Sequence, residues 1–189
     1  MKLLNALILS SAVSFSALFA AEYKVDLAHS YVGFKVRHMM VSNTKGEFQK
    51  FSGHYDYDAS TKKISSLSGV VEVDSVNTRE KKRDDHPKKP EFFDAQRYPK
   101  MLLKLVKHEG SQLTLDLTIK ETTKRVTFEV EDLSVDREDP WGYTRTGFVM
   151  HGKIDRKDYG ISFNKALDNG GIVVGNEVKI TIEIEGIKQ

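Results

Sequence analysis

Apolar and polar residues alternate along most of this chain of 189 residues. The clearest example is residues 178–184, in which four branched apolar residues are separated by Lys179, Thr181 and Glu183. An extended chain with this period has one dry face and one wet face, so each such segment is predicted to be a half-buried β-strand. Strands of this kind must pack as two sheets or close into one barrel, and the chain is therefore predicted to be all-β.

About eight segments carry this pattern, and turn residues separate most of them. The phase of the apolar residues shifts between Phe48 and Phe51, which predicts a bulge or bend there. Alternating strands joined by turns favour an antiparallel barrel or sandwich. The predicted strands cover 30–38, 48–57, 64–73, 101–106, 113–119, 126–130, 148–154 and 178–184.

Two stretches do not fit the strand pattern. We expect a short helix near 77–86 and a helical or loop insertion around 87–99, where Phe92 and Phe93 follow a proline and are placed to plug one end of the structure. Residues 157–171 end in Asp-Asn-Gly-Gly and are predicted to be a loop.

The N-terminus has the layout of a secretory signal peptide. A basic start is followed by an uncharged stretch at 3–19, and cleavage is expected near Ala20. A transmembrane anchor is the alternative, but a span needs roughly 20 apolar residues and this stretch is shorter and rich in serine. We therefore expect residues 21–189 to form one exported domain that is soluble in the periplasm or secreted, with at most peripheral membrane contact.

Composition excludes several classes of function. The chain has no cysteine, which removes thiol catalysis, cysteine-based zinc sites and disulfides. Its formal net charge of +2 gives no general attraction to nucleic acid. Residues 79–89 are a local exception, because six basic side chains stand there against three acidic ones.

Five short motifs in sequence order resemble the YceI family over essentially the whole predicted mature chain. The motifs are Tyr23-x-Val-Asp-x-Ala-His-Ser, Gly46-x-Phe48-x-x-Phe51-x-Gly53, Arg83-Asp84-x-His86, Phe92-Phe93-Asp94-x-x-x-Tyr98-Pro99 and Arg156-x-Asp158-Tyr159-Gly160. The resemblance implies an exported, eight-stranded antiparallel lipocalin-like barrel. It also implies a long apolar tunnel that binds polyisoprenoids and similar amphiphilic lipids.

The interior of an eight-stranded barrel is either filled by side chains or holds one small ligand. Inward-facing Gly53, Gly69 and Gly152 either leave space or allow a strand to coil. A prenyl chain of about twenty carbons would gain roughly 16 kcal/mol gross on burial, while micromolar affinity needs only about 8 kcal/mol. The candidate tunnel residues are Val32, Phe34, Val36, Phe51, Leu115, Leu117, Phe128, Phe148, Met150, Ile180 and Ile182.

A polar head group would need partners at the tunnel mouth. The candidates, taken from the basic segment and from the motifs, are His29, His38, Arg83, His86 and Arg156. Cationic side chains there suit a phosphate or pyrophosphate. The alternative for the basic segment is a solvated loop, and the alternative for His29 is a turn closed by hydrogen bonds with Asp26 and Ser30.

No catalytic or metal-binding motif occurs at the required spacing, because the chain has no His-Glu-x-x-His, no Gly-x-Ser-x-Gly and no glycine-rich phosphate loop. We therefore expect a non-enzymatic protein without cofactor or metal that binds, stores or transports a lipid. A polyprenyl phosphate, an isoprenoid quinone and a fatty-acid derivative fit about equally, and a homodimer remains open. The alternatives are a lipid-modifying enzyme and a structural or stress-response barrel with a filled core.

Overall fold

The computed structural model describes residues 20–163 and 173–189. The predicted signal peptide and the end of the predicted 157–171 loop lie outside these residues. The strands are β1 Ala21–Val25, β2 Tyr31–His38, β3 Ser42–Phe48, β4 Phe51–Asp58, β5 Lys63–Glu72, β6 Val76–Asn77, β7 Lys100–Glu109, β8 Gln112–Ile119, β9 Thr122–Glu131, β10 Arg137–Glu138, β11 Thr144–Asp155 and β12 Val174–Lys188. The helical turns are η1 Leu27–His29, η2 Val73–Ser75, α1 Lys81–Asp84 and η3 Arg156–Tyr159.

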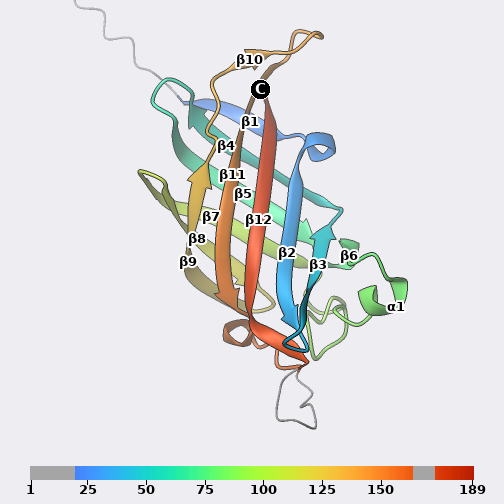
Figure 1. The fold of residues 1–189 in the computed structure, drawn as a ribbon. Helices are drawn as coiled ribbons and strands as arrows, with labels where there is room; N and C mark the ends of the chain where they lie inside the picture. Colours follow the sequence, from blue (N-terminus) through green and yellow to red (C-terminus); the bar gives the residue numbers. More distant parts are fainter. Residues whose placement is uncertain (1–19, 164–172) are drawn as a thin grey trace, which may run out of the picture.

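Eight of these strands form a closed antiparallel barrel in the order β1, β4, β5, β7, β8, β9, β11 and β12 (Figure 1). The ring closes because β12 pairs with β11 along one edge and with β1 along the other. The predicted fold class is therefore confirmed. No helix in the described part of the chain is long and apolar enough to cross a membrane.

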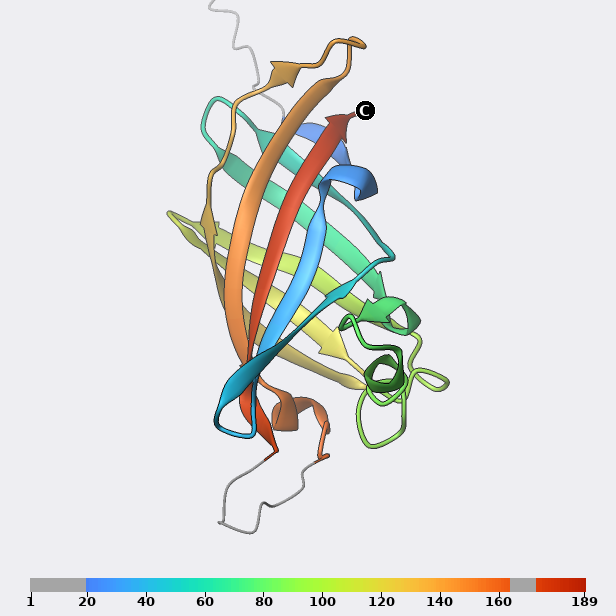
Figure 2. The same cartoon turned by 45° about the vertical axis from the view of Figure 1, so that its right-hand side comes forward.

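The second edge of β12 is shared by two strands. Its last residues pair with β1, and the stretch from Val174 to Glu183 pairs with β2. β2 and β3 then form a hairpin whose tip points toward the end of the barrel that also carries α1 (Figure 2). The short strand β6 pairs with the end of β3 and ties the segment before α1 to the wall.

Most predicted strands are confirmed, with different boundaries. The predicted bend is a strand break, because β3 ends at Phe48 and β4 begins at Phe51. The strands β1, β3, β6 and β10 were not predicted, since β3 is mostly polar and the other three are too short for alternation to stand out. Of the predicted 77–86 helix only the four residues of α1 are helical, and the 87–99 insertion consists of turns.

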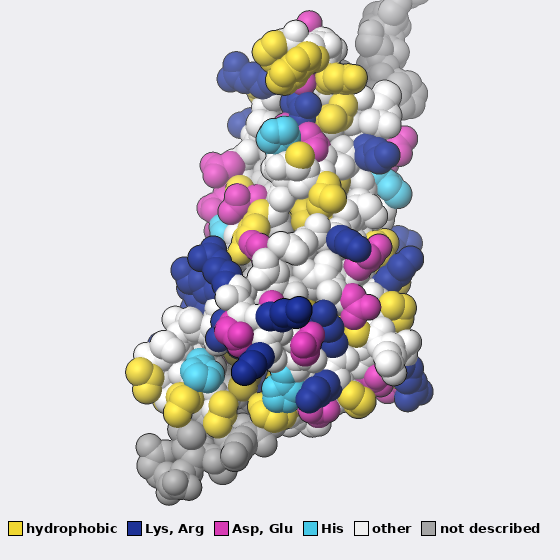
Figure 3. Space-filling view, turned by 90° about the vertical axis from the view of Figure 1, so that its right-hand side faces the viewer, with side chains coloured by type: hydrophobic (Ala, Val, Ile, Leu, Met, Phe, Trp, Pro, Cys, Tyr) yellow, Lys and Arg dark blue, Asp and Glu magenta, His cyan; other side chains and the backbone are white. Residues whose placement is uncertain are grey.

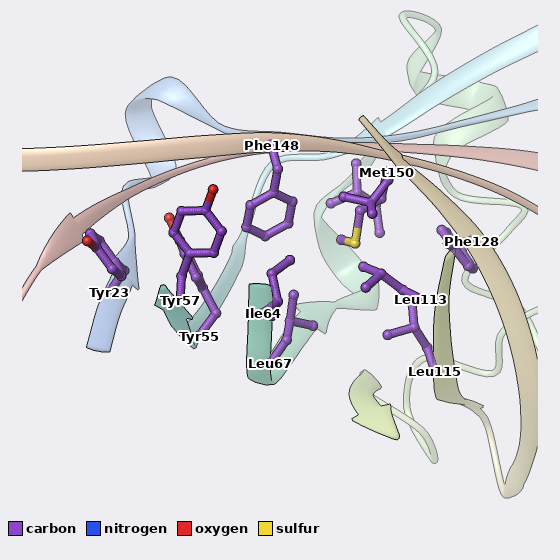
Figure 4. Packing of buried hydrophobic residues seen from close by; sticks show 12 residues of the cluster. Tyr23, Tyr55, Tyr57, Ile64, Leu67, Leu113, Leu115, Phe128, Phe148 and Met150 are labelled. Carbon is purple, nitrogen blue, oxygen red and sulfur yellow. The ribbon is translucent and has the colours of Figure 1, made fainter. Parts of the chain in front are cut away.

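Buried residues form two clusters inside the barrel. The first lies toward the end where β1 begins, and Figure 4 draws its twelve buried residues and labels ten of them, from Tyr23 to Phe128. The second cluster packs η2, η3 and the 87–99 segment onto the opposite end. Space between and beside these clusters therefore decides whether the barrel can hold a guest.

Candidate functional site

The barrel interior contains a cavity of about 350 Å³. This volume is within the range of about 300–1,000 Å³ that is usual for small-molecule sites. Its walls are made mainly of aliphatic and aromatic side chains from the inner faces of the strands. The cavity is therefore suited to an apolar guest, and the interior is not completely filled by side chains.

Ten of the eleven predicted tunnel residues line this cavity. They are Val32, Phe34, Val36, Phe51, Leu117, Phe128, Phe148, Met150, Ile180 and Ile182. Leu115 is the correction: it is fully buried in the first cluster, where neighbouring side chains fill the space, and it does not reach the cavity. Contact of any of these residues with a lipid stays a prediction.

Several lining residues were missed because they lie outside regular alternation. Phe92, Phe93 and Phe163 come from irregular segments at one end, and Ile161 follows η3. The Phe92 and Phe163 rings stack with centroids 4.7 Å apart. The adjacent Phe92–Phe93 pair was the one sequence signal for this part of the wall.

The glycines on the inner face have different roles. A Cβ atom at Gly152 would lie 2.6 Å from the ring of Phe128, so this glycine makes room for that ring. A Cβ atom at Gly69 would have only ordinary contacts, the nearest being 3.8 Å from the carbonyl oxygen of Ser52. Gly69 therefore leaves open space in the cavity wall, whereas the space at Gly152 is already filled.

Three tyrosines, Tyr23, Tyr55 and Tyr57, close one end of the barrel, and we call them the tyrosine plug. All three are about 1% exposed, and the rings of Tyr23 and Tyr55 stack with centroids 5.3 Å apart. Two of the hydroxyls donate hydrogen bonds to residues at this end of the barrel: Tyr23 donates to Asp136 and Tyr57 to the Ser134 carbonyl. Burial raises the pKa of Tyr55 to about 12, so the plug is neutral at ordinary pH.

The opposite end carries all three arginines of the lining and two of its three histidines, and we interpret this end as the mouth of the cavity. Four of the five head-group candidates line the cavity, namely His38, Arg83, His86 and Arg156. His38 ends β2 and pairs with Val174, the first residue of β12. The structure thus brings together side chains from β2, α1 and η3 around one opening.

Arg156 is 3% exposed and is tied to backbone carbonyls. Its guanidinium donates to the carbonyls of Gly175, Ile161 and Val174 at 2.9, 2.7 and 3.2 Å. Burial lowers the pKa of this side chain. Most of its five N–H donors are used, so Arg156 fastens η3 to the start of β12 and adds a positive charge beside the mouth.

Arg83 and His86 are held more loosely. Arg83 donates to the hydroxyl and the carbonyl of Thr78, at 2.8 and 2.6 Å. The His86 ring lies edge-on against Phe92 and Phe163, with centroids 4.8 and 4.7 Å apart. The Nε2 atom of His86 also lies 3.3 Å from the Glu91 carboxylate, so both side chains stand at the rim with protein partners of their own.

His29 lies away from the cavity. Its Nδ1 atom is 2.8 Å from Asp26, whose carboxylate also caps η1 by accepting from the Ala28 amide. Hydrogen bonds from His29 and then from Arg145 lower the pKa of Asp26 to about 2. The turn-closing alternative for His29 is the one that fits this geometry.

Asp26, His29 and Glu185 are close enough to one another to suggest a metal site. Arg145 already donates to both carboxylates at 2.7 Å, so a cation occupies the space between them. A second cation would meet direct repulsion there. We therefore interpret this group as an ion-pair network that fastens the β10–β11 end to η1.

Comparisons with known proteins agree with this architecture. A family model described as the YceI-like domain matches residues 23–186. A UPF0312 protein of Staphylococcus epidermidis is 34% identical over 164 residues, which cover 87% of this chain and 96% of the relative.

Two solved structures share the fold. The Campylobacter jejuni YceI protein is 26% identical with a TM-score of 0.70, and the match covers 81% of this chain and 90% of that chain. A polyisoprenoid binding domain from Saccharophagus degradans, implicated in plant cell wall breakdown, has 14% identity and a TM-score of 0.62 over 90% of this chain and 99% of that one. Since the family model spans most of the sequence, this chain belongs to the YceI-like family.

Proposed function

We propose that this protein binds a polyisoprenoid or similar amphiphilic lipid in its barrel and stores or transports it, without catalysis, in the periplasm. The observation that carries the proposal is the cavity, which is apolar along its length, closed by the tyrosine plug at one end and ringed by polar side chains at the other. An amphiphile with one long tail and one small head matches this asymmetry.

The length of the cavity favours a long tail. On β12 the lining residues run from Val174 to Ile184, a stretch of roughly 33 Å at about 3.3 Å per residue. Barrel strands tilt by about 40°, which leaves about 25 Å along the axis. One leaflet of a bilayer has a hydrocarbon depth of about 15 Å. The lining is therefore long enough to take one extended hydrocarbon tail, such as a prenyl chain.

The charge of the lining favours an anionic head. Three arginines, Arg37, Arg83 and Arg156, line the cavity, and no Asp or Glu does so among the described residues. Charge-assisted hydrogen bonds to phosphate are stronger than bonds between neutral groups. Among the lipid classes considered above, a polyprenyl phosphate therefore fits better than a neutral quinone.

The relatives are consistent with this proposal. A structural neighbour is a polyisoprenoid binding domain, and it shares the closed barrel with this chain. The periplasmic location rests on the N-terminal sequence pattern alone. Fractionation of the native host cell, with the N-terminus of the purified protein sequenced, tests both the location and cleavage near Ala20.

The function is tested by native mass spectrometry of the protein purified from its own host, followed by extraction of any bound lipid. We expect one lipid per chain with a prenyl tail and an acidic head. A protein that stays empty in the presence of octaprenyl phosphate would support the filled-core alternative. Chemical change of the lipid on incubation would support the enzyme alternative.

A further inference from the structure

The tip of the β2–β3 hairpin exposes three consecutive apolar residues beside the cavity mouth. Met39, Met40 and Val41 are 43%, 58% and 81% exposed. His38, immediately before them, lines the cavity, and the Met39 amide donates to the carbonyl of Val173 near the start of β12. The apolar tip is therefore continuous with the rim of the site.

The backbone of this tip has a conformation that is unfavourable for methionine. Met39 and Met40 have φ values of +49° and +62°, and the Val41 amide donates to the His38 carbonyl, so both central residues of the turn are left-handed. Turns of this kind normally use Asn-Gly, because residues with a larger side chain are disfavoured there. Strain of this sort is typical of functional positions.

A side chain also braces the turn. The Arg37 guanidinium donates to the Met40 carbonyl at 2.8 Å. This bond and the bond from the Val41 amide to the His38 carbonyl hold the turn in one conformation, which lowers the backbone entropy lost on contact with a partner.

Four lysines stand in a row across the outer wall behind the tip. Lys45, Lys35, Lys179 and Lys153 are directly opposite one another on β3, β2, β12 and β11. Lys153 has an ion pair with Glu177 at 3.5 Å, and the other three have none within the described residues. Like charges directly opposite each other destabilise a sheet. We therefore interpret this row as a surface that contacts an anionic partner outside the protein. We call it the lysine row.

The spacing of tip and row matches the layers of a membrane surface. Lys35 and Lys45 are each three residues from the ends of the hairpin strands, roughly 10 Å behind the tip. Interfacial apolar groups enter a bilayer by about 5–10 Å, so the lysine row would lie at the phosphate layer. On the face in Figure 3, hydrophobic side chains gather at the lower end and again at the upper end, and Lys and Arg lie between them among acidic residues.

We propose that the apolar hairpin tip and the lysine row dock the mouth of the barrel on an anionic bilayer, from which the lipid enters. This inference rests on the proposed function and adds the surface that serves it. A protruding apolar point backed by cations suits an interface that is apolar inside and anionic at its surface. The shared rim of tip and cavity would let a lipid pass without crossing water.

The test measures binding of the protein to vesicles of phosphatidylglycerol and phosphatidylcholine in equal parts, by flotation. We expect Met39→Asn with Met40→Gly to weaken binding by at least about tenfold, because two apolar side chains leave the bilayer. The same variant should unfold at a higher temperature, since its turn residues suit the backbone. Lys35→Glu should weaken binding by about fivefold or more, and pure phosphatidylcholine should bind poorly.

Trp141 is the matched control, because it is 77% exposed on the β10–β11 hairpin at the plugged end. Trp141→Ser should leave vesicle binding unchanged. Loss of binding in Trp141→Ser, or full binding in the tip variant, would overturn the proposal. Self-association in solution that the tip variant abolishes would overturn it in favour of an interface between two copies.

The two proposals can fail separately. Octaprenyl phosphate delivered from detergent bypasses the membrane, so the tip variant should still take it up in native mass spectrometry. If neither wild type nor variant takes it up while vesicle binding follows the expected pattern, the proposed function is wrong and the docking surface stands.

Discussion

Replacing Gly69 with leucine should block the tunnel without disturbing the barrel. A Cβ atom at this position has its nearest neighbours at 3.8 and 3.9 Å, which is ordinary contact, and the residue lines the cavity on β5. The added side chain therefore extends into space that a lipid tail would otherwise occupy. Its four carbons displace an equal number of tail carbons from the wall.

The magnitude follows from the burial that the tail loses. At about 0.8 kcal/mol per methylene, four carbons are worth about 3 kcal/mol, or roughly a hundredfold weaker binding. The free protein should be at least as stable as wild type, because the new side chain is buried and glycine's freedom in the unfolded chain is removed. A variant that binds the lipid more weakly, but unfolds at the same or a higher temperature, has lost cavity space and kept its fold.

The assay is calorimetric titration with octaprenyl phosphate in a fixed detergent, with thermal unfolding followed by circular dichroism. Ser66→Leu is the matched control, because Ser66 is exposed on the same strand, outside the cavity lining. It should bind as wild type does. Wild-type affinity in a folded Gly69→Leu protein would refute the reasoning, since the tail would then lie elsewhere.

Three further predictions concern stability. The Tyr159 hydroxyl is buried without a hydrogen-bond partner among the described residues, so Tyr159→Phe should stabilise the protein by about 1 kcal/mol in urea unfolding; destabilisation would mean that the hydroxyl has a partner. Arg156→Met strands three carbonyls and should cost at least about 3 kcal/mol in the same assay, and a loss below about 1 kcal/mol would contradict this. The pKa of Tyr55 is raised by burial to about 12 from about 10 in the unfolded chain, so its contribution is complete below pH 10 and is lost as the pH rises to 12. Tyr55→Phe should therefore flatten the fall in stability over this pH range, and an unchanged slope would show that Tyr55 does not ionise there.

The sequence could predict which face each strand buries, because the period of two ties side-chain direction to position. It could not predict how far along the axis an inward residue would lie. Leu115 and Leu117 share one face of β8, about 7 Å apart, yet one packs in the first cluster and the other lines the cavity. Only the long-range pairing of strands sets that difference.

The sequence could not predict which end of the barrel is closed, for a related reason. The tyrosine plug draws Tyr23 from β1 and its two partners from β4, and the closing acceptors come from residues 134–146. Alternation marked Tyr55 and Tyr57 as inward-facing, but it did not say that the end they reach is shut. The basic segment 79–89 was predicted to form a cationic rim, and the Phe92–Phe93 pair was predicted to plug one end. Both lie at the same end of the barrel, where Phe92 and Phe93 line the cavity beside Arg83 and His86.

A barrel with one plugged end has to load and release its guest through the same mouth. Opening the other end would break the hydroxyl bonds of Tyr23, Tyr55 and Tyr57 at about 1 kcal/mol each and would expose three large rings. Among residues 20–163 and 173–189, the segments that cover the mouth are turns, α1 and η3, whose separation costs less than the loss of strand pairing. Under the proposed function, uptake and delivery would therefore compete for one opening, and the direction of transfer would be set by which membrane or partner meets the mouth and not by the barrel itself.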